Sequence, residues 1–183
     1  MNDRFLEVTG MKTEADAMRE ARNSALQQRQ NKVYARDEMG SERTEFRFEL
    51  ARLIREESKV YAQPDQLISD VQHCEAIRTI SDTLSRTFGD ILMGGRMRYG
   101  TSQKALNLYL KFLWRLGKSG VPPHCPVDGN VLEAAGIIGS WTKSDSEKEY
   151  FGWINDIRKK TARLSLAEWE YKVWLASAQR TSG

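Results

Sequence analysis

The chain has few cysteines and no long apolar run. It contains only Cys74 and Cys125 among 183 residues, too few for a disulfide framework, and both fall where a reduced thiol serves as a small apolar residue. No segment approaches the roughly 18 consecutive apolar residues that a membrane span needs. The opening ten residues lack the apolar region of a signal peptide. These absences predict a cytoplasmic protein without a membrane partner.

Acidic residues are also missing from residues 91–127, although the chain has a net charge of only +3. Six basic residues fall in this stretch: Arg96, Arg98, Lys104, Lys111, Arg115 and Lys118. A one-sided basic stretch can face nucleic-acid phosphates, because the release of counterions dominates affinity for DNA. A merely solvated basic face explains the pattern about equally well.

β-type alternation is scarce, and three- and four-residue apolar spacing appears almost everywhere. We therefore expect an all-α fold: a helical bundle of about seven or eight helices, with two lobes around a cleft. Residues 1–40 are polar and rich in helix formers, which predicts a helical but loosely packed N-terminal arm. Residues 41–183 are expected to form a single domain.

Several helix boundaries follow from local signals. Pro64 suits a first helical position, and Leu67 and Val71 then begin one apolar face of a long helix that runs to Phe88. The segment 104–116 is apolar on nearly every side, so its helix should be central and buried. Two capping boxes are predicted, at Ser144 with Glu147 and at Ser165 with Glu168.

Two segments carry the most informative pattern: GTSQKALNLYL from Gly100 and CPVDGNVL from Cys125. Together they resemble the signature of the helix-hairpin-helix DNA glycosylases, the superfamily of 8-oxoguanine glycosylases and endonuclease III. That signature is a hairpin of the form G-x-G-x-K-x-A-[ND], followed after a loop by P-V-D-x-x-V. The matching residues are Gly100, Lys104, Asn107, Pro126, Val127, Asp128 and Val131.

The pattern also departs from the family. Ser102 replaces the second hairpin glycine, which restricts close backbone approach to a phosphate, and Leu106 stands where a small residue is usual. Two cysteines cannot build the four-cysteine iron–sulfur cluster of endonuclease III, so no cofactor is expected. The histidines of His73-Cys74 and His124-Cys125 lack the spacing of a zinc site, and no metal is expected either.

The resemblance implies chemistry for two residues. Lys104 would attack the sugar carbon through its neutral amine and form a Schiff base. Its expected place in the first turn of an apolar helix disfavours the charged form, through both the helix dipole and the loss of water. Asp128 would stabilise the positive charge that develops on the sugar. Taken alone, Asp128 is more often an N-cap and Lys104 a solvated lysine.

The resemblance also implies contacts with DNA. The helix start formed by Gly100, Thr101, Ser102 and Gln103 would hold a phosphate. From the basic stretch, Arg96 and Arg98 would lie along the DNA. His124 would face the DNA or the mouth of the active site, although structural packing explains this histidine at least as well. A flipped base would be held by Trp141. Gln72 and His73 lie away from the main apolar face of their helix, where they would either read base edges or simply be solvated. The tryptophans Trp153, Trp169 and Trp174 lie on apolar stripes and are expected in the core.

The sequence thus predicts a monomeric, nucleoid-associated DNA glycosylase that flips a modified base out of duplex DNA, with accompanying abasic-site lyase activity. Its role would be base-excision repair or anti-phage defence, in the second case by removal of glucosylated hydroxymethylcytosine. One alternative is a non-catalytic helical DNA-binding module. Another is a helical interaction protein that docks through its first 40 residues.

The substitution Asp128→Asn separates a capping role from a catalytic one. Asparagine caps helices about as well as aspartate but supplies no charge. We expect unchanged thermal stability and a loss of base release of about 100-fold or more, measured on DNA that carries the excised base. A variant that keeps both its stability and its full activity would show that Asp128 is only a cap.

Overall fold

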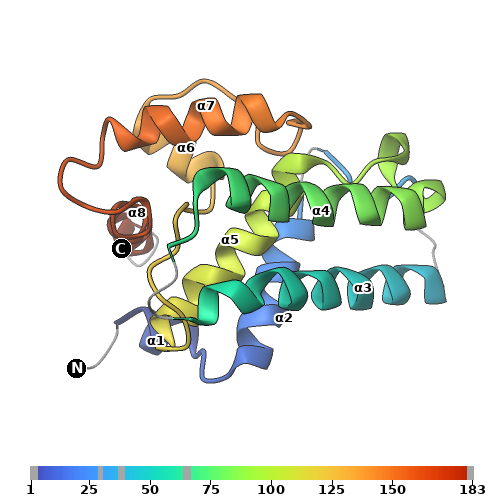
Figure 1. The fold of residues 1–183 in the computed structure, drawn as a ribbon, viewed down its shortest axis with the longest axis horizontal. Coiled ribbons are helices and arrows are strands. Elements are labelled where there is room, and N and C mark those ends of the chain that lie inside the picture. The colour runs from blue at the N-terminus through green and yellow to red at the C-terminus, as the bar shows by residue number, and fades with distance from the viewer. Residues whose placement is uncertain (1–3, 29–30, 37–39, 64–66, 181–183) are drawn as a thin grey trace.

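Helices joined by turns and loops make up the computed structural model, which describes residues 4–28, 31–36, 40–63 and 67–180 (Figure 1). Within these ranges the chain is all-helical and has no strand, which confirms the predicted fold class. None of the described helices is long and apolar enough to cross a membrane. The α-helices are α1 (Arg4–Thr9), α2 (Glu14–Leu26), α3 (Ser41–Ser58), α4 (Asp70–Phe88), α5 (Tyr99–Arg115), α6 (Gly129–Ala135), α7 (Glu147–Arg158) and α8 (Leu166–Arg180).

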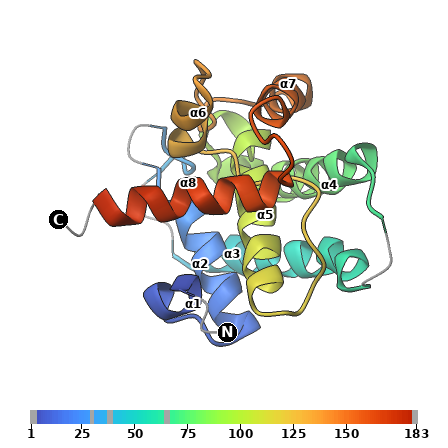
Figure 2. The same ribbon diagram turned by 90° about the vertical axis from the view of Figure 1, so that its left-hand side faces the viewer.

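Helix α5 is the central element, as its composition predicts. Most of its side chains up to Leu113 are buried, and it contacts α2, α3 and α4. Helices α3 and α4 pack against each other, and α6 contacts both α7 and α8. Figure 2 shows α8 crossing one end of the bundle, between α6 and α7 on one side and α1 and α2 on the other.

Helices α1 and α2 belong to the core rather than to a loose arm. Ala17, Ala21 and Ala25 are fully buried on one face of α2, and these small side chains let α2 approach α5 closely. In α1, Phe5 is also buried, with its ring 5.5 Å from that of Phe112 and 4.8 Å from that of Trp174. The prediction of loose packing was wrong because it was based on the scarcity of large apolar residues, whereas α2 is buried mainly through alanines.

Two of the predicted helix starts are shifted in the structure. Helix α7 begins at Glu147 with Ser146 as its N-cap, whereas Ser144 donates a hydrogen bond to the Glu149 carboxylate instead of capping. Helix α4 begins at Asp70, with a capping box between Ser69 and Gln72. By contrast, the capping box predicted at Ser165 and Glu168 is present at the start of α8.

The later start of α4 changes which residues face inward. His73, Cys74 and Ile77 point into the core, whereas Val71 is 73% exposed and Leu67, which precedes the helix, is 96% exposed. The assignment of Leu67 and Val71 to the buried face was therefore wrong. Pro64, predicted as the first helical residue, lies outside the described residues.

A close backbone contact joins the start of α5 to the segment before α7. The amide of Gly100 donates to the Ser144 carbonyl at 2.9 Å, and the Tyr99 amide donates to the Asp145 carboxylate. A Cβ atom at position 100 would lie 1.9 Å from the carbonyl oxygen of Trp141. Only glycine therefore permits this approach, which places Trp141 beside α5.

The substitution Gly100→Ala should destabilise the fold by about 2–4 kcal/mol, because a backbone carbonyl cannot move aside as a flexible side chain can. Gly129→Ala is the matched control, since a Cβ there meets no atom within 4 Å and alanine favours the helix. Urea unfolding of both variants measures the difference. Equal stability of the two variants would contradict the close contact at Gly100.

Candidate functional site

Lys104 and Asp128, 24 positions apart in the sequence, meet in the structure. The Nζ atom of Lys104 lies 3.4 Å from Oδ2 of Asp128, and the two side chains are 13% and 26% exposed. The other oxygen of Asp128 accepts hydrogen bonds from the amides of Asn130 and Val131, so Asp128 caps α6 as well. Lys104 stands in the second turn of α5, not the first, because the helix begins at Tyr99.

The pair lies where two surface hollows adjoin, and both hollows share Lys104, Asp128 and Asn130 as lining residues. The outer hollow has a volume of about 660 Å³ and a mostly polar lining that includes Gln27, Gln28, Gly139, Ser140, Trp141 and Thr142. The inner hollow measures about 430 Å³, and its deeper lining includes Phe5, Leu108, Lys111, Phe112, Glu170 and Trp174. Both volumes are in the usual range for small-molecule sites.

Trp141 forms a wall beside the lysine, as the sequence suggested. The ammonium nitrogen of Lys104 lies 4.3 Å from the centre of the Trp141 ring, a cation–π contact. The backbone contact at Gly100 holds this tryptophan in place. The lysine is thus enclosed by an aromatic ring on one side and a carboxylate on another.

The side chain of Gln103 holds the loop that carries Asp128. Its Nε2 donates to the Val127 carbonyl at 2.6 Å, and its Oε1 accepts from the Val127 amide at 3.1 Å. One turn later, Nδ2 of Asn107 lies 3.1 Å from the Cys125 carbonyl. We refer to these contacts of Gln103 and Asn107 as the loop clamp. They align the Cys125–Val127 backbone with α5, and the residue after Val127 then faces Lys104.

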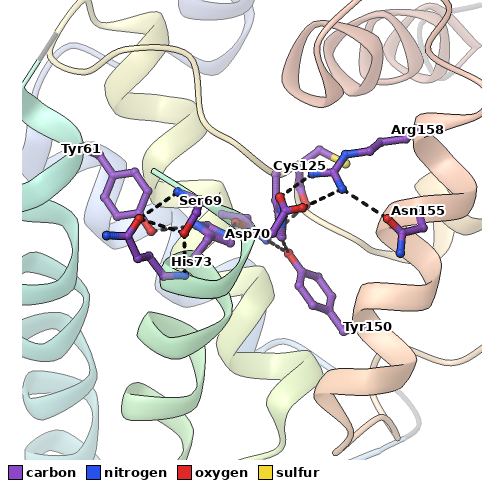
Figure 3. A network of polar contacts seen from close by, with 11 residues as sticks. Tyr61, Ser69, Asp70, His73, Cys125, Tyr150, Asn155 and Arg158 are labelled. Atoms are coloured by element: carbon purple, nitrogen blue, oxygen red, sulfur yellow. Dashed lines mark hydrogen bonds and ion pairs between the residues drawn. The ribbon is translucent and has the colours of Figure 1, made fainter. Parts of the chain in front are cut away.

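The loop clamp continues into a buried polar network (Figure 3). Oδ1 of Asn107 accepts from Nε2 of His73 at 2.8 Å, so Nδ1 of His73 accepts from the Tyr61 hydroxyl. Both ring nitrogens of His73 are therefore satisfied with the ring neutral. Burial, together with nearby His124, holds the pKa of His73 well below its usual value.

His124, in the loop before α6, is a second buried histidine with hydrogen bonds at both ring nitrogens. Its Nε2 donates to Oδ1 of Asp70 at 2.9 Å, and its Nδ1 accepts from the Tyr150 hydroxyl at 2.8 Å. Arg158 also donates to the Asp70 carboxylate, which links α7 to the start of α4 (Figure 3). Burial lowers the pKa of His124 to about 4 although Asp70 favours the charged ring, so this ring is also neutral at pH 7.

Three residues predicted to contact DNA or a flipped base therefore have other roles. His124 and His73 are fully buried inside the network and line neither hollow at Lys104. Gln72 is exposed, but its side chain accepts from Ser69 at the start of α4, away from Lys104. The hydrogen-bond partners of the two histidines could not be predicted from the sequence, because Tyr61, Asn107 and Tyr150 belong to other elements.

The predicted phosphate site at the start of α5 is occupied by protein groups. Thr101, Ser102 and Gln103 are buried, and the amides of Thr101 and Ser102 donate to the Arg98 carbonyl. The Gly100 amide is bonded to Ser144, as described above. The proposed phosphate grip of these four residues is thus not available, because the segment before α7 covers this helix end.

The basic stretch is likewise divided among protein partners. Arg96 forms ion pairs with Asp82 and Asp145, and Arg98 donates to the carbonyls of Lys32 and Thr142. Lys118 pairs with Glu14, at 3.1 Å. Arg115 lies over the rings of Trp114 and Tyr171. The six residues therefore do not form the continuous phosphate-facing surface that their order in the sequence suggested.

Lys111 was counted in the predicted basic stretch, but it forms a buried ion pair with Glu170 that was not predicted. Lys111 lies in α5, seven residues after Lys104 and on the same face, while Glu170 comes from α8. Both line the inner hollow, and the Lys111 side chain is only 2% exposed. The available signal was a lysine on the narrow polar stripe of a largely buried helix, but nothing in the sequence indicated its partner.

Among the residues that the structure describes, no three His, Cys, Asp or Glu side chains gather as a metal site would require. Comparisons with protein-family models, with curated proteins and with solved structures found no match for this chain. The resemblance to the helix-hairpin-helix glycosylases therefore stays a prediction from the two segments that carry it.

The neutral His124 makes stability depend on pH. An unfolded histidine has a pKa near 6.5, so acid favours the unfolded chain, and stability present above that value is lost as the pH falls toward 4. We expect protonation of His124 to lower the free energy of unfolding by about 3 kcal/mol as the pH falls from about 6.5 to about 4. The lowered pKa of Asp70 acts only below its ordinary value of 3.8, outside the window.

The measurement is denaturant unfolding at several pH values between 7 and 4. A His124→Gln variant is the control, since glutamine does not titrate. It should be less stable at pH 7 but should lose less stability on acidification than the wild type. Parallel curves for the two proteins would mean that His124 is not held neutral by the fold.

Proposed function

We propose that this protein is a DNA glycosylase, with Lys104 as the nucleophile and Asp128 as the carboxylate that assists it. The observation that carries the proposal is their 3.4 Å contact at the junction of two hollows. A half-buried amine beside a carboxylate in a surface hollow is a frequent arrangement at reactive sites. The two residues also occupy the matching positions of the family signature, which adds a second, separate reason.

The geometry supports a distinct chemical role for each of the two residues. The lysine must lose a proton before its nitrogen can attack, and Oδ2 of Asp128 is a suitable acceptor in contact with it. The Nζ lone pair would then form a bond to the sugar carbon. The glycosidic bond would break, its electron pair going to the base, which leaves after protonation. The proton that Asp128 took from Lys104 would pass to the departing base, which leaves the Asp128 carboxylate ionised beside the positive charge of the resulting Schiff base.

The two hollows suit the two parts of a flipped nucleotide. The outer hollow is polar and open, as a bound sugar and its phosphate require, and it contains Trp141. The inner hollow has three aromatic rings in its lining, from Phe5, Phe112 and Trp174. Aromatic side chains hold flipped bases by stacking.

In this proposal α4, residues 89–98 and α5 form the helix-hairpin-helix element, and duplex DNA with a modified base is the partner. Because protein groups occupy the start of α5, contacts with the phosphate backbone must come from other residues around the outer hollow. The proposal covers base release with strand cleavage through the Schiff base. Repair of oxidised bases and defence against phage DNA with glucosylated bases are the two candidate roles.

Borohydride trapping tests the proposal. The wild-type protein is incubated with duplexes that carry normal, oxidised or glucosylated bases, and the reduced adduct is detected by denaturing electrophoresis. We expect a covalent adduct with at least one duplex and none with Lys104→Ala. Lys118→Ala is the matched control, because this exposed lysine lies outside both hollows and should leave the adduct unchanged.

Other outcomes discriminate between the alternatives. Base release without an adduct would reduce Lys104 to a positioning role. Salt-sensitive DNA binding without release or abasic sites would favour the non-catalytic DNA-binding module instead. Absence of DNA binding even at low salt would overturn the nucleic-acid function altogether.

A further inference from the structure

The buried pair of Lys111 and Glu170 has an incomplete set of hydrogen bonds. Nζ of Lys111 lies 2.8 Å from Oε1 of Glu170 and 2.7 Å from Oε2. Only the contact with Oε1 has hydrogen-bond geometry, so Oε2 accepts no hydrogen bond from any described residue. Glu170 is only 5% exposed and lines the inner hollow. Oε2 of Glu170 is therefore a buried oxygen beside this hollow that forms an ion pair with Lys111 but accepts no hydrogen bond of good geometry from the described residues.

Folding alone does not require such a pair. Removing two charges from water costs several kcal/mol for each ion, and well-packed apolar residues of similar volume are often at least as stable. The surroundings are mainly aromatic: Nζ of Lys111 lies 5.2 Å from the centre of the Phe5 ring and 5.5 Å from that of Trp174. A buried charged pair next to aromatic rings in the wall of a hollow is thus a candidate for ligand recognition.

The pair also lies at a suitable distance from the reactive lysine. Lys111 follows Lys104 by two helical turns, about 10 Å along the axis of α5, and Leu108 lines the hollow between them. A nucleotide whose sugar lies at Lys104 would extend its base toward Lys111 and Glu170. The carboxylate would then accept from the base, and the ammonium would donate to it.

We propose that Lys111 and Glu170 read the flipped base, and that they bind a base edge on which a hydrogen-bond donor stands beside an acceptor. This assignment rests on the glycosylase function proposed above and adds its specificity-determining residues. Adenine, for example, has such an edge, with an amino group beside a ring nitrogen. Burial raises the pKa of Glu170 despite the neighbouring ammonium, and an N–H that donates to Oε2 would stabilise the ionised form.

The test replaces the pair as a unit, with Lys111→Met and Glu170→Leu combined, so that neither charge is left buried alone. The matched control makes the same two replacements in an exposed ion pair. Glu56→Leu lies in the last turn of α3, and Lys59→Met lies directly after this helix. Thermal unfolding, base release in a single turnover and borohydride trapping on a duplex with an abasic site are measured for each protein. The abasic duplex has no base to read, so its trapping reports on Lys104 alone.

We expect the buried double variant to unfold at or above the wild-type temperature and to lose base release by about 100-fold, the effect of two missing hydrogen bonds to charged groups. Its trapping on the abasic duplex should stay within the range of the control pair. Should the double variant unfold early, Lys111→Gln combined with Glu170→Gln replaces it, because two amides can hydrogen-bond each other without a buried charge, and the ratio of base release to abasic trapping decides in the same way.

Two results would overturn the reading role: base release that equals that of the control, or an equal loss of base release and abasic trapping in a folded variant. Failure of the proposed function looks different. A wild-type protein that neither releases a base nor forms an adduct with the abasic duplex would overturn the enzyme itself, and base reading with it.

Discussion

The hydrogen bonds between the side chain of Gln103 and the peptide groups of Val127 connect the central helix to the loop that precedes α6. Residues 124–127 of this loop are buried, and they belong to no helix whose own backbone hydrogen bonds would satisfy their amides and carbonyls. Buried peptide groups need partners, and the Gln103 amide supplies both a donor and an acceptor, as a neighbouring strand would. Because Gln103 precedes Lys104 and Val127 precedes Asp128, the same contacts bring the amine and the carboxylate together.

The polar network around Asn107 extends this constraint to the rest of the molecule. Asn107 joins α5 to His73 of α4 and to Tyr150 of α7, and His124 joins the loop to Asp70. These groups are buried but hydrogen-bonded, so they avoid the cost of unsatisfied polar atoms. A network of this kind tolerates few alternative arrangements, because moving any element would leave several groups without partners. The polar stripe of α5 thus specifies how its neighbours pack.

The N-terminal segment has a larger part than its polar composition indicates. Helix α2 covers α5 with alanines, and Phe5 and Met11 contribute to the lining of the inner hollow. Exposed ion pairs on this surface contribute little to stability because water screens them. The pairs at Lys104 and Lys111 differ from them, since they lie half-buried or buried beside the hollows. Residues between Phe5 and Gln28 therefore contribute directly to the surroundings of the candidate site.

Sequence periodicity was enough to predict the all-helical class, the central position of α5 and the cap of α8, because each depends on residues within one or two turns. Two short segments also identified Lys104 and Asp128, whose contact the structure then showed. The roles of His73, His124 and Glu170, the covered start of α5 and the packing of α2 were decided only by tertiary structure. For the polar side chains among them, the partners lie between 12 positions away, as with His73 and Tyr61, and 59 positions away, as with Lys111 and Glu170. Spacing within one helix indicates which residues share a face, but burial and hydrogen bonding depend on what the rest of the chain brings to that face.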